Sequence, residues 1–171
     1  MKREIKSQTP TVQDIAQVVA DTKSFPFLTY IGPRTWRSFD GYYAAYEDNV
    51  FAGVLAVNKF DGWIKLGPLV VLSKFHGKGV ATALVKKAVT TEKGNIYLAS
   101  ANPKVWKITQ KLGMVEKYNW LNLPFPVRVI YLRLSLNVVR CGEFIPFVKE
   151  MLRKQRLANV HHHRHFVTIR Q

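Results

Sequence analysis

The sequence lacks the features that mark an exported or membrane-spanning protein. Cys141 is the single cysteine, so no disulfide can form within the chain. No apolar run approaches the roughly 18 residues that a membrane-spanning helix needs. The opening segment MKREIKSQTP has no apolar stretch of the kind found in a secretory signal. We therefore expect a cytoplasmic protein with no membrane partner.

Acidic residues are also scarce. The 171 residues include 11 Asp and Glu against 26 Lys and Arg, which gives a net charge of +15. Most of this excess lies after residue 73, where 18 basic and 4 acidic side chains give a net charge of +14. Such a field attracts phosphates and nucleic acid and tends to repel cationic substrates such as basic protein tails. Solubility alone is the simpler explanation of the same charge.

The hydrophobic content is sufficient for a packed core. Hydrophobic residues make up 47% of the chain and charged residues 22%, which excludes a wholly disordered chain. The length suits one domain.

The spacing of apolar residues predicts an α/β chain. Thr11 with Asp14 is typical of a helix start, and Asp61-Gly62 is a two-residue hairpin signal. A short strand at 4–7 is followed by a regular series of expected elements: helix 11–21, strands 41–47, 50–60 and 63–72, helix 80–91, strand 95–99, helix 102–112, and strands 115–121 and 127–136.

A glycine-containing loop joins the third strand of the expected meander to a helix. Residues 69–81 read LVVLSKFHGKGVA. Backbone amides at such a junction, together with the helix dipole, form a site for a phosphate or pyrophosphate. The spacing of Gly77 and Gly79 matches neither GxxxxGK[ST] nor GxGxxG, which excludes the P-loop and Rossmann motifs.

This segment resembles motif A of the GNAT acyltransferase superfamily, in which a strand leads into Gln/Arg-x-x-Gly-x-Gly/Ala at a helix start. Ala101-Asn102 and the sequence KLGM at 111–114 resemble the next block of that superfamily. The resemblance covers about residues 4–136 and implies the GNAT fold, with a mixed, mostly antiparallel sheet flanked by helices. It divides the chain into a GNAT domain at 1–136 and a basic, histidine-containing extension at 137–171, packed on or next to the core.

The resemblance also implies acetyl-CoA, or another acyl-CoA, as cofactor. Backbone groups at the end of the strand would pair with the pantetheine amides, the loop amides would hold the pyrophosphate, and Asn102 would contact the pantetheine arm. The expected cofactor-binding residues are Leu69, Val70, Val71, Leu72, His76, Gly77, Lys78, Gly79, Val80, Ala81 and Asn102.

Two positions depart from the family pattern. His76 replaces the usual Gln or Arg, and Thr109 stands where many members place a tyrosine that protonates the leaving CoA thiolate. A threonine hydroxyl is too weak an acid for that role, so Tyr97 and Tyr118 are the candidate replacements. The family often uses a glutamate of the meander as base. The strand at 63–72 has no carboxylate. Asp61 is therefore the candidate for the catalytic base, and Asp40 and Glu47 are further possibilities.

Basic side chains form two further candidate sites. Three lysines share one face of the helix after Asn102, and the segment 144–157 is predicted to be an amphipathic helix with its cations outward. Solvated helix faces would explain both sets, although contact with phosphates fits their lack of acidic partners. The candidate nucleic-acid-binding residues are Lys104, Lys107, Lys111, Arg153, Lys154, Arg156, Arg164 and Arg170.

The cluster at 161–165 contains four histidines and Arg164, and we expect it to be a protonatable surface segment with no metal.

Three functional hypotheses follow. The first is an acetyl-CoA-dependent N-acetyltransferase that acts on an amine carried by, or close to, nucleic acid, such as an aminoacyl-tRNA or a modified base. The second is a nonenzymatic module of the same fold that binds nucleic acid or a ribonucleoprotein, which the absence of tyrosine at position 109 favours. The third is an acetyltransferase for small amines or proteins.

Overall fold

The computed structural model describes residues 2–25, 28, 30–117, 122–157 and 164–169. Within these residues seven strands form one sheet, in which β4 and β5 are the only parallel neighbours and the other pairs are antiparallel. In spatial order the strands are β1 (Arg3–Lys6), β2 (Gly41–Glu47), β3 (Val50–Phe60), β4 (Trp63–Val71), β5 (Asn95–Ser100), β7 (Arg164–Thr168) and β6 (Val115–Lys117).

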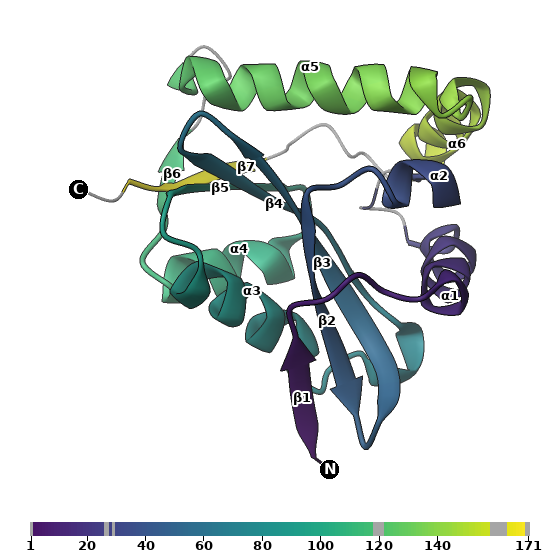
Figure 1. The fold of residues 1–171 in the computed structure, drawn as a ribbon, viewed down its shortest axis with the longest axis horizontal. Helices are drawn as coiled ribbons and strands as arrows, with labels where there is room; N and C mark the ends of the chain where they lie inside the picture. Colours follow the sequence, from purple (N-terminus) through teal and green to yellow (C-terminus); the bar gives the residue numbers. More distant parts are fainter. Residues whose placement is uncertain (1, 26–27, 29, 118–121, 158–163, 170–171) are drawn as a thin grey trace.

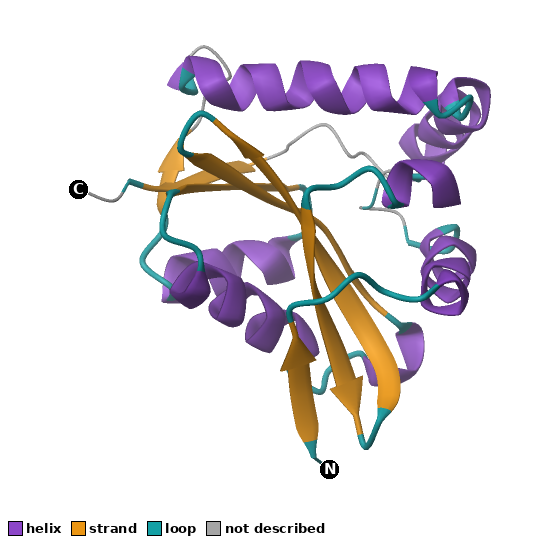
Figure 2. Cartoon of the chain, viewed as in Figure 1, coloured by secondary structure: helices purple, strands orange, loops and turns teal. Residues whose placement is uncertain are grey.

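Helices cover both faces of this sheet (Figure 1). Figure 2 shows α3 and α4 on one side, and α1, α2, α5 and α6 on the other. Their bounds are α1 (Val12–Thr22), α2 (Pro33–Trp36), α3 (Val80–Thr91), α4 (Pro103–Lys111), α5 (Phe125–Arg140) and α6 (Phe144–Leu157), with a 3-10 turn, η1, at Ser73–Phe75. The mixed, mostly antiparallel sheet flanked by helices confirms the expected fold class.

The predicted local signals are present. The Thr11 hydroxyl accepts from Asp14 N at 3.1 Å and the Asp14 carboxylate accepts from Thr11 N at 3.0 Å, which is the reciprocal cap of α1. Asp61 and Gly62 form the two-residue turn between β3 and β4 with φ of +47° and +71°. The middle of β3, residues 54–57, is almost fully buried, as expected for a strand covered on both faces.

The expected strand at 127–136 is wrong, because this segment lies within helix α5. Its many β-branched residues suggested a strand, but its buried positions follow a helical period: Val127, Ile130 and Val138 face inward. Pro126, in the first turn, suits a helix start. Of the strand expected at 115–121, the structure describes residues 115–117, which form β6. Residues 118–121 lie outside the described part of the chain.

The sheet is completed by the C-terminal part of the chain. The structure places β7 between β5 and β6, where Leu98 pairs with Phe166 and Glu116 also pairs with Phe166. The boundary expected at residue 136 falls inside α5, and the segment beyond it supplies both the predicted amphipathic helix α6 and a strand of the sheet. Among the described helices, none has the length and hydropathy required to cross a bilayer.

Candidate active site

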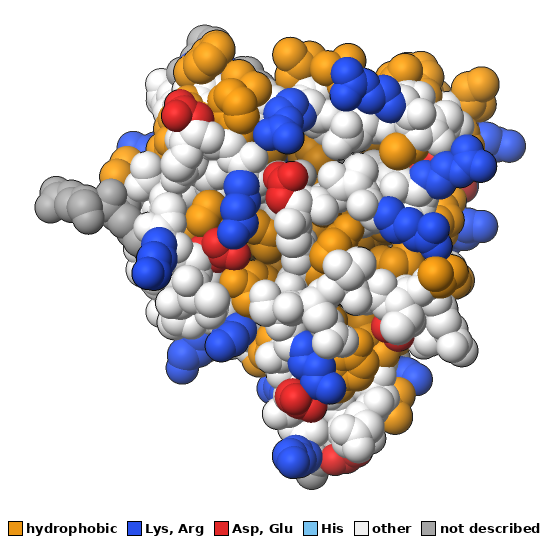
Figure 3. Space-filling model, viewed as in Figure 1, with side chains coloured by type: hydrophobic (Ala, Val, Ile, Leu, Met, Phe, Trp, Pro, Cys, Tyr) orange, Lys and Arg blue, Asp and Glu red, His pale blue; other side chains and the backbone are white. Residues whose placement is uncertain are grey.

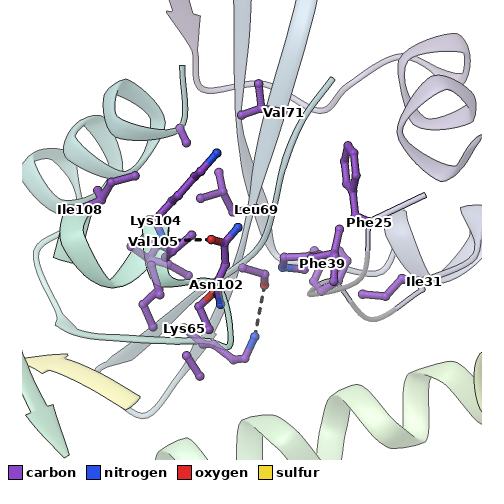
Figure 4. Close-up of a pocket in the computed structure, with 18 of the residues that line it drawn as sticks. Phe25, Ile31, Phe39, Lys65, Leu69, Val71, Asn102, Lys104, Val105 and Ile108 are labelled. Carbon is purple, nitrogen blue, oxygen red and sulfur yellow. Dashed lines mark hydrogen bonds between the residues drawn. The ribbon is translucent and has the colours of Figure 1, made fainter. Parts of the chain in front are cut away.

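A cavity of about 970 Å³ opens where β4 and β5 separate. The two parallel strands pair from Trp63 opposite Asn95 to Leu66 opposite Leu98, and beyond this point no further pairs form although both strands continue. Figure 4 shows Val105 and Ile108 of α4 on one side of the cavity and Phe25, Ile31 and Phe39 on the other. The ends of β4 and β5, which no longer pair with each other, therefore form a V between the two helical layers.

Most of the expected cofactor-binding residues line this cavity, namely Leu69, Val71, His76, Gly77, Gly79, Val80, Ala81 and Asn102. The other three do not line it. Val70 and Leu72 are buried in the core, and the Lys78 amine lies over the ring of Phe75, 5.1 Å from its centroid. Successive strand residues point to opposite faces, which explains why Leu69 and Val71 reach the cavity and Val70 does not.

The loop before α3 has the geometry of an anion site. Gly77 and Gly79 have φ of +77° and +78°, a region that favours glycine. The first backbone hydrogen bond into α3 runs from Ala83 N to Gly79 O, so the preceding amides of the helix start have no partner within the helix. Arg3 of β1 holds the loop from outside by donating to Lys78 O at 2.5 Å. These residues fit the pyrophosphate of an acyl-CoA.

His76 occupies the rim of the cavity. Its Nε2 lies 2.8 Å from Val71 O, and its ring packs against Phe25 with centroids 5.2 Å apart. The imidazole therefore already uses one of the backbone acceptors expected to pair with a pantetheine amide.

The α4 side of the cavity contains no acid that could replace the missing tyrosine. Asn102 caps α4 by accepting from Lys104 N at 2.9 Å, as expected for an N-cap residue. Thr109 is fully buried, and its hydroxyl donates to Trp106 O at 2.9 Å within the helix. Thr109 therefore does not reach the cavity.

A chain of hydroxyl and imidazole groups lies at the base of the V. The hydroxyl of Tyr97 is 2.9 Å from that of Tyr131 and 2.6 Å from His165 Nδ1. Tyr131 and His165 line the cavity, whereas Tyr97 lies behind them and is fully buried. Burial raises the pKa of both tyrosines. The sequence singled out Tyr97 but not Tyr131, which it placed on a strand, nor His165, which it placed on the surface.

The other candidate catalytic residues that the structure describes do not line the cavity. Tyr118 is outside the described residues. Asp61 lies in the β3–β4 turn and does not line the cavity. The Asp40 carboxylate accepts from Lys59 N, and Glu47 pairs with Arg3. No Asp or Glu is among the described residues that line the cavity.

Lys65 was missed by the sequence analysis. It lies on β4 with 8% of its surface exposed, and its amine donates to Gly67 O at 3.3 Å. Burial lowers the pKa of this amine to about 8. Strand alternation was the available signal, because a lysine at this position of a buried strand points into the protein.

The candidate nucleic-acid-binding residues divide into two groups. Lys104, Lys107 and Lys111 are exposed on α4, and none has a salt bridge to another described residue. The described candidates of the C-terminal segment, Arg153, Lys154 and Arg164, contact the protein itself. Arg153 pairs with Glu150, and the Arg164 guanidinium lies 4.2 Å from the ring centroid of Trp106.

The outward orientation expected for Lys154 is wrong. This residue is 4% exposed, and its amine donates to Thr22 O and Leu28 O. The side chain of Arg156, the whole of Arg170 and the histidines at 161–163 lie outside what the structure describes. Figure 3 shows basic side chains spread over one face and interrupted by acidic and hydrophobic ones. Among the described residues, no cluster of three or more His, Cys, Asp or Glu could hold a metal ion.

Solved structures share this fold at low sequence identity. A GNAT-family acetyltransferase from Staphylococcus aureus Mu50 is 13% identical, with 73% of this chain and 91% of that one covered and a TM-score of 0.60. A GNAT-family acetyltransferase from Brucella melitensis, crystallised with acetyl-CoA, is 18% identical. The match covers 67% of this chain and 83% of that one, with a TM-score of 0.50. A Pyrococcus horikoshii protein assigned as an acetyltransferase is 17% identical. The match covers 68% of this chain and 44% of that one, with a TM-score of 0.55. The chain thus spans less than half the length of the Pyrococcus protein.

No curated protein matches this sequence closely enough to be counted as a relative. The model of the acetyltransferase (GNAT) family matches residues 12–114, which include the meander, the glycine loop and α4. The fold, the open V between β4 and β5 and this match agree, and the chain belongs to the acetyltransferase (GNAT) family.

Proposed function

We propose that this chain transfers an acyl group from acetyl-CoA, or a related acyl-CoA, to the nitrogen of an amine. One observation carries the proposal: a single cavity joins the free amides at the start of α3 to the V between β4 and β5. Helix-start amides suit a pyrophosphate, and unpaired strand edges suit an amide-bearing arm. The Brucella acetyltransferase that shares the fold was crystallised with acetyl-CoA, which supports this ligand.

The transfer requires two proton movements. The amine nitrogen bonds to the thioester carbonyl carbon, the carbon–sulfur bond breaks, and its electron pair goes to sulfur. The nitrogen then loses a proton and the thiolate gains one. The protein must position the two reactants and supply the groups that carry these protons.

We assign to Tyr131 the role of the acid that protonates the leaving thiolate. Its phenol lines the cavity and its raised pKa keeps it protonated at neutral pH. Tyr97 acts as a positioning residue, because its hydroxyl contacts Tyr131 from behind and also reaches His165. The imidazole of His165 is the cavity-lining group suited to take a proton from the acceptor, since no described carboxylate lines the cavity.

Ligand binding by the full chain tests the proposal directly. If acetyl-CoA binds the folded protein only, ligand at 100 times its Kd adds about 2.7 kcal/mol to the free energy of unfolding and raises Tm. Mass spectrometry of a mixed panel of amines, incubated with acetyl-CoA and enzyme, should then detect an acetylated product. The absence of any Tm shift at millimolar acetyl-CoA or CoA would contradict the assignment.

An amine linked to nucleic acid is a second candidate acceptor. The observation that favours it is the exposed row of Lys104, Lys107 and Lys111, of which Lys104 also lines the cavity. Three phosphate contacts would give a log–log salt slope of about −2 to −3 for RNA or DNA binding. The triple change of these lysines to Gln should flatten that slope, whereas Lys86→Gln with Lys87→Gln on α3 should not. Deletion of residues 137–171 is unsuitable as a test, because it removes β7 from the sheet.

A nonenzymatic role remains the alternative for the same fold. The threonine at position 109 favours a nonenzymatic role, because the usual tyrosine is missing there. The phenol that Tyr131 brings to the cavity from α5 favours an enzyme. CoA binding without turnover on any amine in the panel, including small amines and peptides, would support this alternative.

A further inference from the structure

Lys65, the third residue of β4, lines the cavity at its base. Figure 4 shows the Lys65 side chain below Asn102 and Phe39, with a dashed line from its amine to a hydrogen-bond acceptor. Its amine contacts Gly67 O at 3.3 Å and the ring of Tyr131, whose centroid is 5.4 Å away. One backbone carbonyl and one aromatic face solvate a buried ammonium poorly.

No carboxylate balances this charge among the described residues. The five salt bridges of the described chain involve other residues, and no described cavity-lining residue is Asp or Glu. The cross-strand neighbours of Lys65 are Asn58 and Tyr97, which are both uncharged. The lowered pKa of Lys65 has desolvation as its cause, which agrees with the missing counter-charge. Buried lysines are ordinarily paired.

Two other buried polar groups among the described residues have no hydrogen-bond partner. The Nδ2 donor of Asn58 is buried and unbonded, and so is the hydroxyl of Thr35. Thr35 lines the same cavity from α2 and is 1% exposed. Asn58 lies opposite Lys65 on β3 without lining the cavity, whereas Lys65 and Thr35 are both cavity-lining donors. Such donors are complementary to an anionic oxygen ligand.

We propose that Lys65 binds a carboxylate of the ligand at the base of the cavity. The inference rests on the proposed function, because it assumes that the cavity holds the reactants of acyl transfer. The carboxylate has two possible sources: the far end of the acyl group of a dicarboxylic acyl-CoA, or an acceptor amine that also carries a carboxylate. The phosphates of CoA are not a source, since Lys65 precedes Val71 by six residues, which is about 20 Å along a strand from the phosphate loop.

The walls around Lys65 limit what carries the carboxylate. Phe39 and Leu134 line the same cavity as Lys65 and give it apolar walls. An ammonium group would meet no described carboxylate there and would be repelled by Lys65, which disfavours polyamines. The ligand therefore combines a carboxylate with an apolar body.

Matched pairs of ligands test the proposal on the full chain. The first pair is succinyl-CoA against acetyl-CoA, and the second is phenylalanine against phenethylamine in the presence of saturating CoA. Isothermal titration should show that, in one of the two pairs, the wild type binds the ligand with the carboxylate at least about tenfold more tightly than the ligand without it. A charged hydrogen bond gives a difference of this size. The pair that shows the preference identifies the source.

Variants locate the preference. Lys65→Met, which keeps the length of the side chain, should abolish the preference, and Lys65→Arg should retain part of it. Lys87→Met removes the same charge from the exposed face of α3 and should leave both titrations unchanged. CoA binding by Lys65→Met reports that the cavity is still folded.

Two outcomes would overturn the proposal while CoA binding remains intact. One is a wild type that prefers the carboxylate in neither pair, and the other is a preference that survives in Lys65→Met. Loss of CoA binding by the wild type would instead overturn the proposed function, so the two failures are distinguishable.

Discussion

The hydroxyl of Tyr97 lies 2.6 Å from Nδ1 of His165, and this contact joins β5 to β7 at the base of the cavity. The two rings also stack, with centroids 6.0 Å apart and an interplanar angle of 22°. The histidine belongs to a cluster that the sequence suggested to be a surface segment. Pairing of β7 with β5 brings it instead beside the tyrosine that the sequence proposed as an acid.

Tyr131→Phe should lower kcat by about 10² to 10⁴, because it removes the phenol that reaches the cavity. Tyr97→Phe should have a smaller effect, since it removes the contacts that position Tyr131 and His165 but leaves both groups in place. Thr109→Ala should leave kcat within a few fold. Steady-state kinetics with acetyl-CoA measures all three, and a Tyr131→Phe enzyme as fast as wild type would transfer the acid role to water.

Gly79→Val should abolish the Tm rise produced by acetyl-CoA. A β-branched residue is strained at the φ of +78° found there, and its side chain would crowd the amides of the anion site. Gly62→Val is the matched control, because Gly62 has a φ of +71° in the β3–β4 turn, away from the phosphate loop. Thermal denaturation with and without ligand should show a similar loss of basal stability in both variants. A ligand-induced rise that persists in Gly79→Val would contradict the loop assignment.

Arg3→Met should weaken CoA binding and destabilise the protein. Arg3 donates to Lys78 O and also pairs with Glu47, which is 2% exposed. Removal of Arg3 leaves that buried carboxylate unpaired, which costs on the order of 3 kcal/mol. Adding Glu47→Gln should recover much of the stability without restoring CoA affinity. Chemical denaturation and titration calorimetry separate the two effects, and full recovery of affinity in the double variant would exclude a loop-bracing role.

Lys65→Met should stabilise the protein in the absence of ligand. The pKa of the Lys65 amine is lowered from 10.5 to about 8, which corresponds to about 3 kcal/mol at neutral pH. Because the unfolded chain keeps this proton at higher pH than the folded one, the free energy of unfolding of the wild type should rise between about pH 8 and 10.5. Lys65→Met lacks this titrating group, so the difference in free energy of unfolding between the variant and the wild type should shrink over that pH range. Urea denaturation of both proteins at pH 7 and in the alkaline range measures the difference, and equal stability at both would show that Lys65 is not charged and buried.

Local sequence determined most of the core elements. The cap at Thr11 and the turn at Asp61-Gly62 each depend on neighbouring residues, so they can be identified without knowledge of the rest of the chain. The glycine loop at 76–81 is of the same kind, which explains why most of the expected cofactor-binding residues line the cavity.

Tertiary structure decided the remainder of the candidate site. The segment at 127–136 has residues that favour a strand, and its helical form becomes favourable through burial of one face against β3 and β4. Tyr131 therefore reaches Tyr97 from α5, and His165 reaches it from β7, across sequence separations of 34 and 68 residues. Burial within the fold lowers the pKa of Lys65, whose amine lies 5.4 Å from the ring centroid of Tyr131 on α5. These properties depend on long-range pairing and burial, which no short stretch of sequence encodes.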